Sequence, residues 1–403
     1  MSFLIVSCGY KNSKQSRDLL SPEHLQKSGE IWNGEINEKW FDKQHDEFSI
    51  YTAQEFAGLS NLVNSGLTSF VDKKIHIESD IMLNNTALID TWNETKPMNT
   101  WTPIGTDTNP FKGIIDFKGH YVEGMYVNNE YLSVKQSNLG LFGNVELKAP
   151  DSPTYINNLN LKSSVIKVSE NDQEALNVGS VVGKICNGGT FGALNGLANI
   201  MSSCKIVLAS KSVKYLGGIS GFTQANVFNS CYTGKFDLVN FEGNAGGITG
   251  GGAIPSFVLN SYSTVFISDN KLDPKESGVI SFHGIPISCY YLKNTSVNKG
   301  NFAFGYARRI ENNDNLLSYG NGTFSDPDST IRITPREEVK WNGSSGLYGD
   351  NRIDSETKYI ANLLTALNQF TFEKNFTFQK KDNCYLSSWD STDGYPVLNY
   401  DKR

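Results

Sequence analysis

The chain has 403 residues and a formal net charge of −6, and its Lys and Arg residues form no run. This balance argues against a nucleic-acid-binding protein, because contacts to phosphates need clustered positive charge. The 37 glycines, 23 phenylalanines and 18 tyrosines, against five methionines, favour a β-rich protein with tight turns.

Residues 1–30 are largely polar and are predicted to form a tether. Within them, FLIVSCG at 3–9 resembles the end of a bacterial lipoprotein signal, which predicts a lipid anchor on Cys8. No basic leader precedes this run, and four apolar residues are few for such a signal, so an ordinary short apolar N-terminus is the alternative. No other segment approaches the ~20 apolar residues of a membrane span.

Residues 31–110 are predicted to form an N-terminal cap and the first rung of a solenoid. Thr52 and Glu55 make a capping box, and the apolar residues that follow at helical spacing predict a helix over 53–64. This helix is expected to cover the first rung, since an exposed sheet edge invites aggregation. The alternating segment 73–84 is predicted to be the first strand.

Residues 111–293 are predicted to form the β-helix. From Leu139 to Tyr291 they repeat one short phrase, in which a glycine-rich apolar step is followed by a polar-apolar strand. The clearest steps are GLFG at 140–143, GSVVG at 179–183, GGISG at 217–221 and GGITG at 246–250. Each unit is too short to bury a core alone, so neighbouring units must stack. The sequence therefore predicts an all-β fold, a parallel β-helix with glycines at the rung corners.

Four positions of the repeat are interpreted as equivalent: Cys204, Cys231, Tyr262 and Cys289, at spacings of 27, 31 and 27 residues. Stacked ~4.8 Å apart, their side chains are predicted to form an inward column of small apolar groups. The six cysteines include no CxxC pair, so buried thiols are favoured over a disulfide or a metal site.

Residues 294–403 are predicted to contain degenerate rungs and a C-terminal cap. Helical spacing over 357–370 predicts a second helix, and 384–400 is typical of a strand with a tight turn. A divergent end unit is what a solenoid requires, so this region is expected to close the second end of the coil.

Several segments in the right order resemble bacterial GLUG-motif proteins, over roughly residues 31–400. These segments are TAQEFAGLSNLVNSG, WTPIGT, FKGIIDFKGHYVEGMYV, LGLFGNV, the GGISG and NSCYTG units, and SSWDSTDGYPVL. The resemblance implies a right-handed parallel β-helix of the kind found in surface proteins, adhesin-like products and secreted proteins. It implies no catalytic motif. The sequence departs from the family at 116–119, where DFKG replaces a DGNG-like turn, and at 294–340, where the repeats are poorly kept.

Candidate catalytic groups are few and scattered. The carboxylates considered are Asp107, Asp116, Asp151 and the DPDS run at 326–329, and none forms a repeated acid pair of the sort that glycosidases need. Asp116 is interpreted as a turn or stacking residue, and His120 and His283 as packed or bonded strand histidines. The histidine spacing predicts no zinc site, and no cofactor is expected.

Aromatic residues offer a further interpretation, since rings that line one exposed face could stack on sugars. The candidates for ligand contact are Trp92, Trp101, Trp341, Tyr290 and Tyr291. Packing in the caps and the core is the alternative for each of them.

Together these patterns predict a non-enzymatic cell-surface or secreted β-helix that binds or displays a glycan, a host protein or a matrix ligand. A glycan-active enzyme, either a polysaccharide lyase or a glycoside hydrolase, is the first alternative, and a phage tail or fibre domain is the second. A monomer is favoured, nucleic acid is not expected as a partner, and membrane contact is expected only through a lipid on Cys8, as in an outer-membrane lipoprotein.

Overall fold

The computed structural model describes most of the chain up to residue 265 and short stretches beyond it. The described residues are 27–132, 134–147, 155–170, 174–186, 195–252, 256–265, 277–278, 280–282, 285–287, 289–291, 339–340, 359–360, 364, 367–368, 370–372, 385–390 and 395–401. The predicted tether up to residue 26, Cys8, Asp151, the DPDS run at 326–329, Trp341 and most of the predicted degenerate rungs lie outside them.

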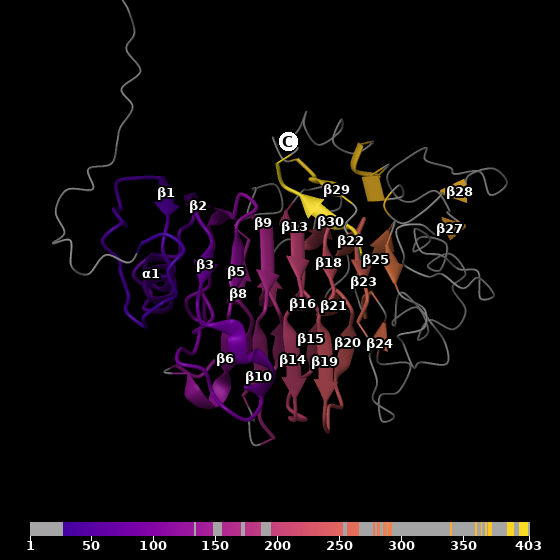
Figure 1. Cartoon of the computed structure of the whole chain (residues 1–403), viewed down its shortest axis with the longest axis horizontal. Coiled ribbons are helices and arrows are strands. Elements are labelled where there is room, and N and C mark those ends of the chain that lie inside the picture. Colours follow the sequence, from indigo (N-terminus) through magenta and orange to yellow (C-terminus); the bar gives the residue numbers. More distant parts are fainter. Residues whose placement is uncertain are drawn as a thin grey trace, which may run out of the picture.

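Parallel strands stack along the long axis of the molecule, so the prediction of a parallel β-helix is confirmed (Figure 1). A 13-stranded sheet, here called sheet 1, runs the length of the described coil. Its main path is β1 (Glu47–Ile50), β2 (Lys74–Ile77), β4 (Ile114–Asp116), β9 (Tyr155–Lys162), β13 (Gly196–Ser202), β17 (Asn226–Phe228), β22 (Phe257–Leu259) and β25 (Ile285–Ile287). Its side strands are β3 (Ile81–Met82), β5 (Tyr121–Glu123), β18 (Cys231–Tyr232), β23 (Tyr262–Ser263) and β26 (Tyr290–Tyr291).

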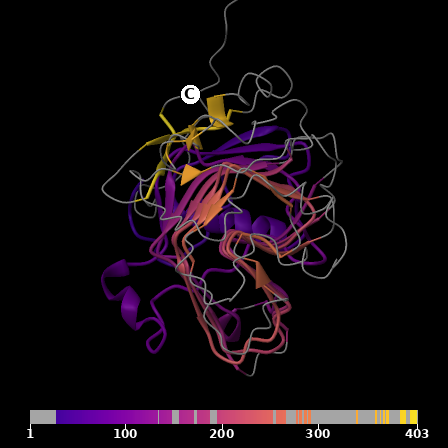
Figure 2. The ribbon, with the colours of Figure 1, turned by 90° about the vertical axis from the view of Figure 1, so that its right-hand side faces the viewer.

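From the rung of β4 onward, three smaller parallel sheets complete the coil, in the chain order sheet 1, sheet 2, sheet 3, sheet 4. Sheet 2 consists of β6 (Tyr126–Asn128), β10 (Val165–Val168), β14 (Lys205–Leu208) and β19 (Lys235–Leu238). Sheet 3 consists of β7 (Asn138–Leu139), β11 (Asn177–Gly179), β15 (Tyr215–Gly217), β20 (Asn244–Gly246) and β24 (Ser277–Gly278). Sheet 4 consists of β8 (Phe142–Glu146), β12 (Val182–Cys186), β16 (Ser220–Thr223) and β21 (Thr249–Gly252). Viewed at right angles to Figure 1, the outlines of successive rungs nest within one another (Figure 2).

Apolar side chains form continuous columns inside the coil. The column from sheet 1 contains Phe48, Ile75, Ile115, Ile156, Leu197, Val227 and Val258, all in register and all buried. Sheet 2 contributes Val127, Ile166, Ile206 and Phe236 in the same way. Each rung supplies hydrogen bonds and apolar contacts to its neighbours, which is why units this short fold together.

The glycine phrases lie where sheet 3 turns into sheet 4. Gly179, Gly217 and Gly246 stack in register, and Gly183, Gly221 and Gly250 form a second column opposite. A Cβ at Gly250 would lie 2.2 Å from the Leu216 carbonyl oxygen, so the two strands approach too closely for any side chain. The prediction that these glycines occupy rung corners is therefore confirmed.

The N-terminal cap begins with the helix that the capping box predicts. Helix α1 (Ala53–Asn64) starts at Thr52, whose hydroxyl accepts from the Glu55 amide at 3.2 Å while the Glu55 carboxylate accepts from the Thr52 amide at 3.2 Å. Phe56 and Leu59 of this helix are fully buried in the end of the apolar core. Two short 3-10 helices, η2 (Thr86–Thr91) and η3 (Asn129–Tyr131), lie in later loops.

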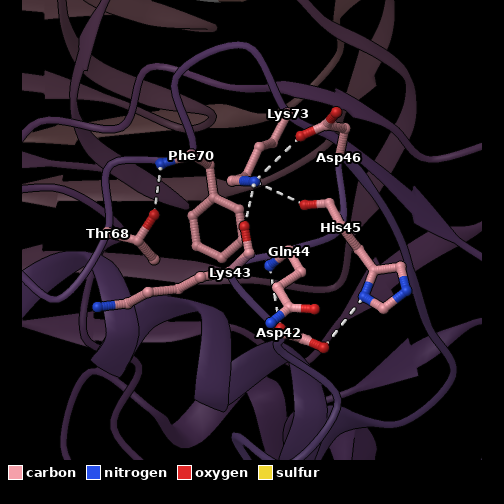
Figure 3. Close-up of polar contacts among 8 residues, drawn as sticks. All are labelled: Asp42, Lys43, Gln44, His45, Asp46, Thr68, Phe70 and Lys73. Carbon is pink, nitrogen blue, oxygen red and sulfur yellow. Dashed lines mark hydrogen bonds and ion pairs between the residues drawn. The ribbon is translucent and has the colours of Figure 1, made fainter.

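The first strand comes earlier than predicted. β1 precedes α1, and the segment predicted as one strand over 73–84 contains both β2 and β3. Lys73 holds the loop before β1, because its Nζ donates to the carbonyl oxygen of His45 at 2.6 Å and to the Asp46 carboxylate at 3.2 Å (Figure 3). Its ammonium also lies 5.7 Å from the centroid of the Phe48 ring, so this lysine is engaged in the cap.

The predicted equivalence of four repeat positions is only partly right. Cys231 pairs with Tyr262, but the partner of Cys231 in β13 is Met201, and Tyr262 pairs onward with Tyr290. Cys204 and Cys289 therefore lie outside this column. They point into the core, whereas Cys231 alternates with the inward Tyr232 and faces outward, so no single inward column of thiols forms.

The C-terminal region lies against the side of the coil. Helical residues occur between 364 and 372, whereas Tyr359–Ile360 forms β28 and pairs antiparallel with β27 (Val339–Lys340), so the helical conformation begins later than predicted. β29 (Ser388–Asp390) and β30 (Val397–Asn399) form an antiparallel hairpin that lies beside sheet 1, outside the nested rungs (Figures 1 and 2). We call the described residues from 364 to 401 the C-terminal segment.

Among the residues that the structure describes, no helix has the length and apolarity needed to cross a membrane.

Candidate functional site

The outer surface of sheet 1 changes character along the coil. Side chains alternate across a strand, so residues next to the inward column face outward. One outward column runs in register through Ser49, His76, Asp116, Asn157, Ala198, Phe228 and Leu259. It is polar over the first four rungs and apolar over the next three. The C-terminal segment covers the apolar part, and its Tyr400 also lies against Gly119 in the polar rungs.

The polar rungs carry a group of ionisable and polar side chains that we call the polar face. Its members are Ser49, His76, Glu78, Asp80, Asp116, Lys118, His120, Tyr121, Glu123 and Lys162, from β1, β2, β4, β5, β9 and the turns between them. They come from rungs that lie ~4.8 Å apart, which places residues distant in sequence side by side.

Glu78 and Lys118 form the first contact of the polar face. The Lys118 Nζ lies 2.6 Å from Glu78 Oε1, and the Ser49 hydroxyl donates to the same oxygen at 3.3 Å. Partial burial opposes ionisation of Glu78, but the hydrogen bond and positive charge of Lys118 outweigh it and lower the pKa of this carboxyl. Glu78 is therefore a carboxylate, bound to a cation, at neutral pH.

His120 and Asp80 form the second contact. Asp80 Oδ1 lies 3.1 Å from His120 Nδ1 and accepts a hydrogen bond from the Tyr121 amide at 3.1 Å. The two side chains are 34% and 37% exposed, so a ligand can reach both of them from solvent. The carboxylate orients the imidazole and leaves its Nε2 side for a further partner.

Tyr121 and Lys162 lie next to this pair. Lys162 Nζ lies 3.5 Å from the centroid of the Tyr121 ring and 3.6 Å from Glu123 Oε2. Partial burial and the negative charges of Asp80 and Glu123 raise the pKa of the Tyr121 phenol, so it stays a neutral hydrogen-bond donor.

Asp116 behaves as predicted for a turn residue. Its Oδ1 accepts from the Lys118 amide at 2.8 Å and from Asn158 Nδ2 at 2.8 Å. Asp107, another candidate carboxylate, lies on a different side of the coil and contacts Lys184 at 3.2 Å and Asn138 at 3.0 Å. These two acids are not brought together.

The tryptophans named as ligand-contact candidates are buried where the structure describes them. Trp101 is 1% exposed, stacks on Phe56 with ring centroids 5.0 Å apart, and donates to the Leu141 carbonyl oxygen at 3.0 Å. Trp92 is 3% exposed and packs edge-on against Tyr126. Packing, the alternative interpretation, describes both of them.

Tyr290 and Tyr291 form β26, whose partner is β23, and their side chains lie outside the described part of the structure. His283 also lies outside it.

The covered part of sheet 1 contains an asparagine ladder that the sequence reasoning missed. Asn158, Asn199, Asn229 and Asn260 have positive φ angles between 46° and 57° and stand at one corner of successive rungs. The Nδ2 atoms of Asn199, Asn229 and Asn260 each donate to the Oδ1 of the preceding ladder asparagine, at 2.9, 2.8 and 2.7 Å. The signal was present, since asparagine tolerates this left-handed backbone and recurs at separations of 41, 30 and 31 residues.

In the described residues, no group of three or more His, Cys, Asp or Glu side chains is arranged to hold a metal ion. The polar face thus offers hydrogen-bond donors and acceptors, ion-paired carboxylates and one oriented imidazole. Such a set suits recognition of a polar ligand, and an imidazole oriented by a carboxylate also suits proton transfer.

Comparisons with known proteins give little further guidance. No family model matches the chain, and no curated protein matches it. Among solved structures, the chain is similar to one named a putative immunoglobulin A1 protease from Bacteroides ovatus, at 12% identity and a TM-score of 0.41, over 88% of this chain and 93% of that one. Identity and TM-score are both too low for this likeness to support an argument about activity.

One prediction is nevertheless corrected by that comparison. The chain was predicted not to be an enzyme, and the protein found is named as an enzyme, so this prediction no longer stands. No particular activity replaces it, because the likeness is remote.

Proposed function

We propose that this protein is a cell-surface or secreted binding module of the adhesin-like type, and that its polar face holds a glycan or a host or matrix protein. The observation that supports this proposal is the exposed pair of His120 and Asp80 beside Tyr121, on strands fixed by the stacked rungs. Binding groups on a rigid sheet lose little conformational freedom when a ligand arrives.

The chemistry of the polar face favours a polyhydroxylated ligand. Carboxylate oxygens of Asp80 and Glu123 accept hydrogen bonds, and the Tyr121 phenol and Lys162 ammonium donate them. These groups alternate within a few ångströms, which matches the mixed donors and acceptors of sugar hydroxyls. The glycine phrases and their order support a proposal that the chain is related to GLUG-motif proteins.

A glycan-active enzyme is the second candidate. It is favoured by the same His120–Asp80 contact of 3.1 Å, because an imidazole held by a carboxylate can move a proton. Glycoside cleavage would also need a second group on the opposite side of the sugar bond, and Glu78 and Glu123 are further carboxylates of the polar face.

The test is binding of the full-length chain to an array of glycans and host matrix proteins, followed by titration of each ligand found. We expect Tyr121→Phe and His120→Ala to weaken binding by about tenfold, the loss of one or two hydrogen bonds. Lys211→Ala is the matched control, since Lys211 pairs with Glu242 in an exposed loop outside the polar face.

Ligands that bind the two variants and the wild type equally would contradict the proposed site. Release of shorter glycans from the same ligands, lost in His120→Ala, would favour the enzyme over the binding module.

A further inference from the structure

The C-terminal segment is held to sheet 1 by side-chain amides. In the described residues, its hairpin strands β29 and β30 pair only with each other, and neither joins the ladder of sheet 1. Asn199 instead clamps one peptide unit, since its Nδ2 donates to the Tyr385 carbonyl oxygen at 2.8 Å and its Oδ1 accepts from the Ser387 amide at 2.9 Å. This pair of bonds recognises an extended backbone whatever its side chains.

The next rung continues the same pattern. Asn229 Nδ2 donates to the Ser387 carbonyl oxygen at 2.8 Å, and Asn229 Oδ1 accepts from Trp389 Nε1 at 2.6 Å. Residues 385, 387 and 389 thus meet successive ladder asparagines. The ladder is a row of amides that binds alternate residues of an extended strand.

A third asparagine binds the helical residues of the segment. Asn260 Nδ2 donates to the Leu367 carbonyl oxygen at 3.0 Å, and Asn368 exchanges two hydrogen bonds of 2.8 Å with the backbone of Trp389. The helical residues and the hairpin therefore attach as one unit.

Apolar contacts complete the attachment. Phe228 and Leu259 face outward and are covered by Leu386 and Phe370, and all four are buried. Trp389 packs on the ring of Tyr262, with centroids 5.6 Å apart, and the Tyr262 hydroxyl donates to the Pro396 carbonyl oxygen at 2.6 Å. Without the segment, this outward apolar column would be exposed, and a contiguous exposed apolar patch is typical of an interaction site.

We propose that the asparagine ladder with its outward apolar column is a peptide-binding track, and that its partner in trans is the C-terminal segment of a second copy of this chain. The amide pairs and the Trp389 contact would be identical whether the segment belongs to the same chain or to another. Exchange of an identical element between copies requires no new contact, so it is a low-cost route to an oligomer.

The chain is long enough for this exchange. The segment joins the last rung through roughly 70 residues, and an extended chain spans up to ~3.3 Å per residue. Which arrangement dominates depends on the protein concentration, because exchange between copies is bimolecular and the contact within one chain is not.

The test uses two full-length variants that are each defective on one side of the contact. Ser387→Pro with Trp389→Ala removes the amide and the indole that bind the ladder, so the attachment of that chain's own segment to its track is weakened. Asn199→Gly with Asn229→Gly removes the clamps, and glycine keeps the positive φ of 55° and 48° at these corners. The attachment of the segment to the track of that second chain is then weakened, while the segment itself is intact.

We expect each variant alone to be a monomer of about 44.6 kDa, and an equimolar mixture to contain a one-to-one dimer by native mass spectrometry and light scattering. Asn158→Gly is the matched control for the second variant, because Asn158 has a φ of 57° and bonds to Asp116, Asn157 and the ladder residue Asn199, with no hydrogen bond to the described segment. Chains with this control substitution should give at least tenfold less dimer.

A mixture that remains monomeric, with both variants folded by circular dichroism, would overturn the proposal. If the glycine pair does not fold, a labelled peptide of residues 385–401 is titrated into the Ser387→Pro, Trp389→Ala chain. Saturable binding that a Trp389→Ala peptide weakens at least tenfold supports the track, and absence of saturable binding overturns it.

Discussion

Replacing Gly217 by alanine tests the stacked glycine corners most sharply. Gly217 ends β15, immediately before the turn into sheet 4, and its φ lies outside the left-handed region. Alanine can therefore adopt the local backbone, and the whole penalty must come from the space around the new methyl group.

That space is closed by backbone on two sides. The added Cβ would lie 1.9 Å from the Ser220 carbonyl oxygen and 2.8 Å from the Gly250 amide nitrogen, whereas 3.4–4 Å is ordinary contact. Neither neighbour is a flexible side-chain end, so the rungs must separate locally. Overpacking of this kind costs about 3 kcal/mol at the upper end of its usual range. The stiffer unfolded chain of the alanine variant offsets up to about 1 kcal/mol, which leaves a net loss of about 2 kcal/mol or more.

Urea unfolding followed by circular dichroism measures this loss, with Gly29→Ala as the control. Nothing lies within 4 Å of a Cβ at Gly29, and its φ of +79° leaves only a backbone penalty of roughly 1 kcal/mol. Equal free energies of unfolding for the two variants would refute the close approach of sheets 3 and 4.

Three further outcomes follow from the same structure. Burial raises the pKa of Cys231 to about 12, and Cys204 and Cys289 are also buried. Of the four thiols that the structure describes, iodoacetamide at pH 8 should therefore alkylate the partly exposed Cys186 first, measured by peptide mapping of the folded and urea-unfolded chain. Faster labelling of Cys231 would contradict its burial under the C-terminal segment. The pKa of Glu78 in the folded chain lies below its ordinary 4.5, so the stability that this carboxylate contributes is complete above that pH and is lost as the pH falls through the folded value. In urea unfolding from pH 2.5 to 7, the free energy of unfolding of Lys118→Met should therefore fall less steeply at acid pH than that of the wild type, and an equal fall would contradict the ion pair. Trp101→Ala should lower the free energy of unfolding by about 3–5 kcal/mol, because it removes a buried indole. The fraction that remains folded should keep its ligand affinity in titrations, and a selective loss of affinity would show that this ring contacts the ligand.

The sequence predicted the coil because its strongest pattern reflects the backbone itself. Glycine is required where sheets 3 and 4 meet, so the phrases GGISG and GGITG stand at successive turns and fall in register. The capping box of Thr52 likewise depends only on local geometry, and α1 forms over the predicted residues.

The alignment of the cysteines failed for a physical reason. Rungs differ in length, as the ladder separations of 41, 30 and 31 residues show, and the extra residues enter loops between the strands. Equal spacing therefore does not identify equivalent positions. The corner asparagines do identify equivalent positions, because the turn requires their positive φ, whereas Cys204 only fills space in the core.

The polar face was beyond the reach of sequence patterns. Asp80 and His120 are 40 residues apart and meet only because their rungs are adjacent. The aromatic candidates misled for the opposite reason, since Trp101 matches a sugar-binding residue in type but packs behind α1 against Phe56. The outward apolar column of Phe228 and Leu259 could be recognised as covered only once the C-terminal segment was seen to lie on it.

Hydroxyl-radical footprinting of the full-length chain, resolved by residue with mass spectrometry, tests the division of sheet 1 into open and covered parts. With rates normalised to the urea-unfolded chain, we predict rapid oxidation of Met98, which is 79% exposed, and intermediate rates for His120 and Tyr121. Tyr262 and Trp389, at 1% and 2% exposure, should be strongly protected. Oxidation of Tyr262 and Trp389 at rates close to that of Met98 would show that the C-terminal segment does not cover sheet 1.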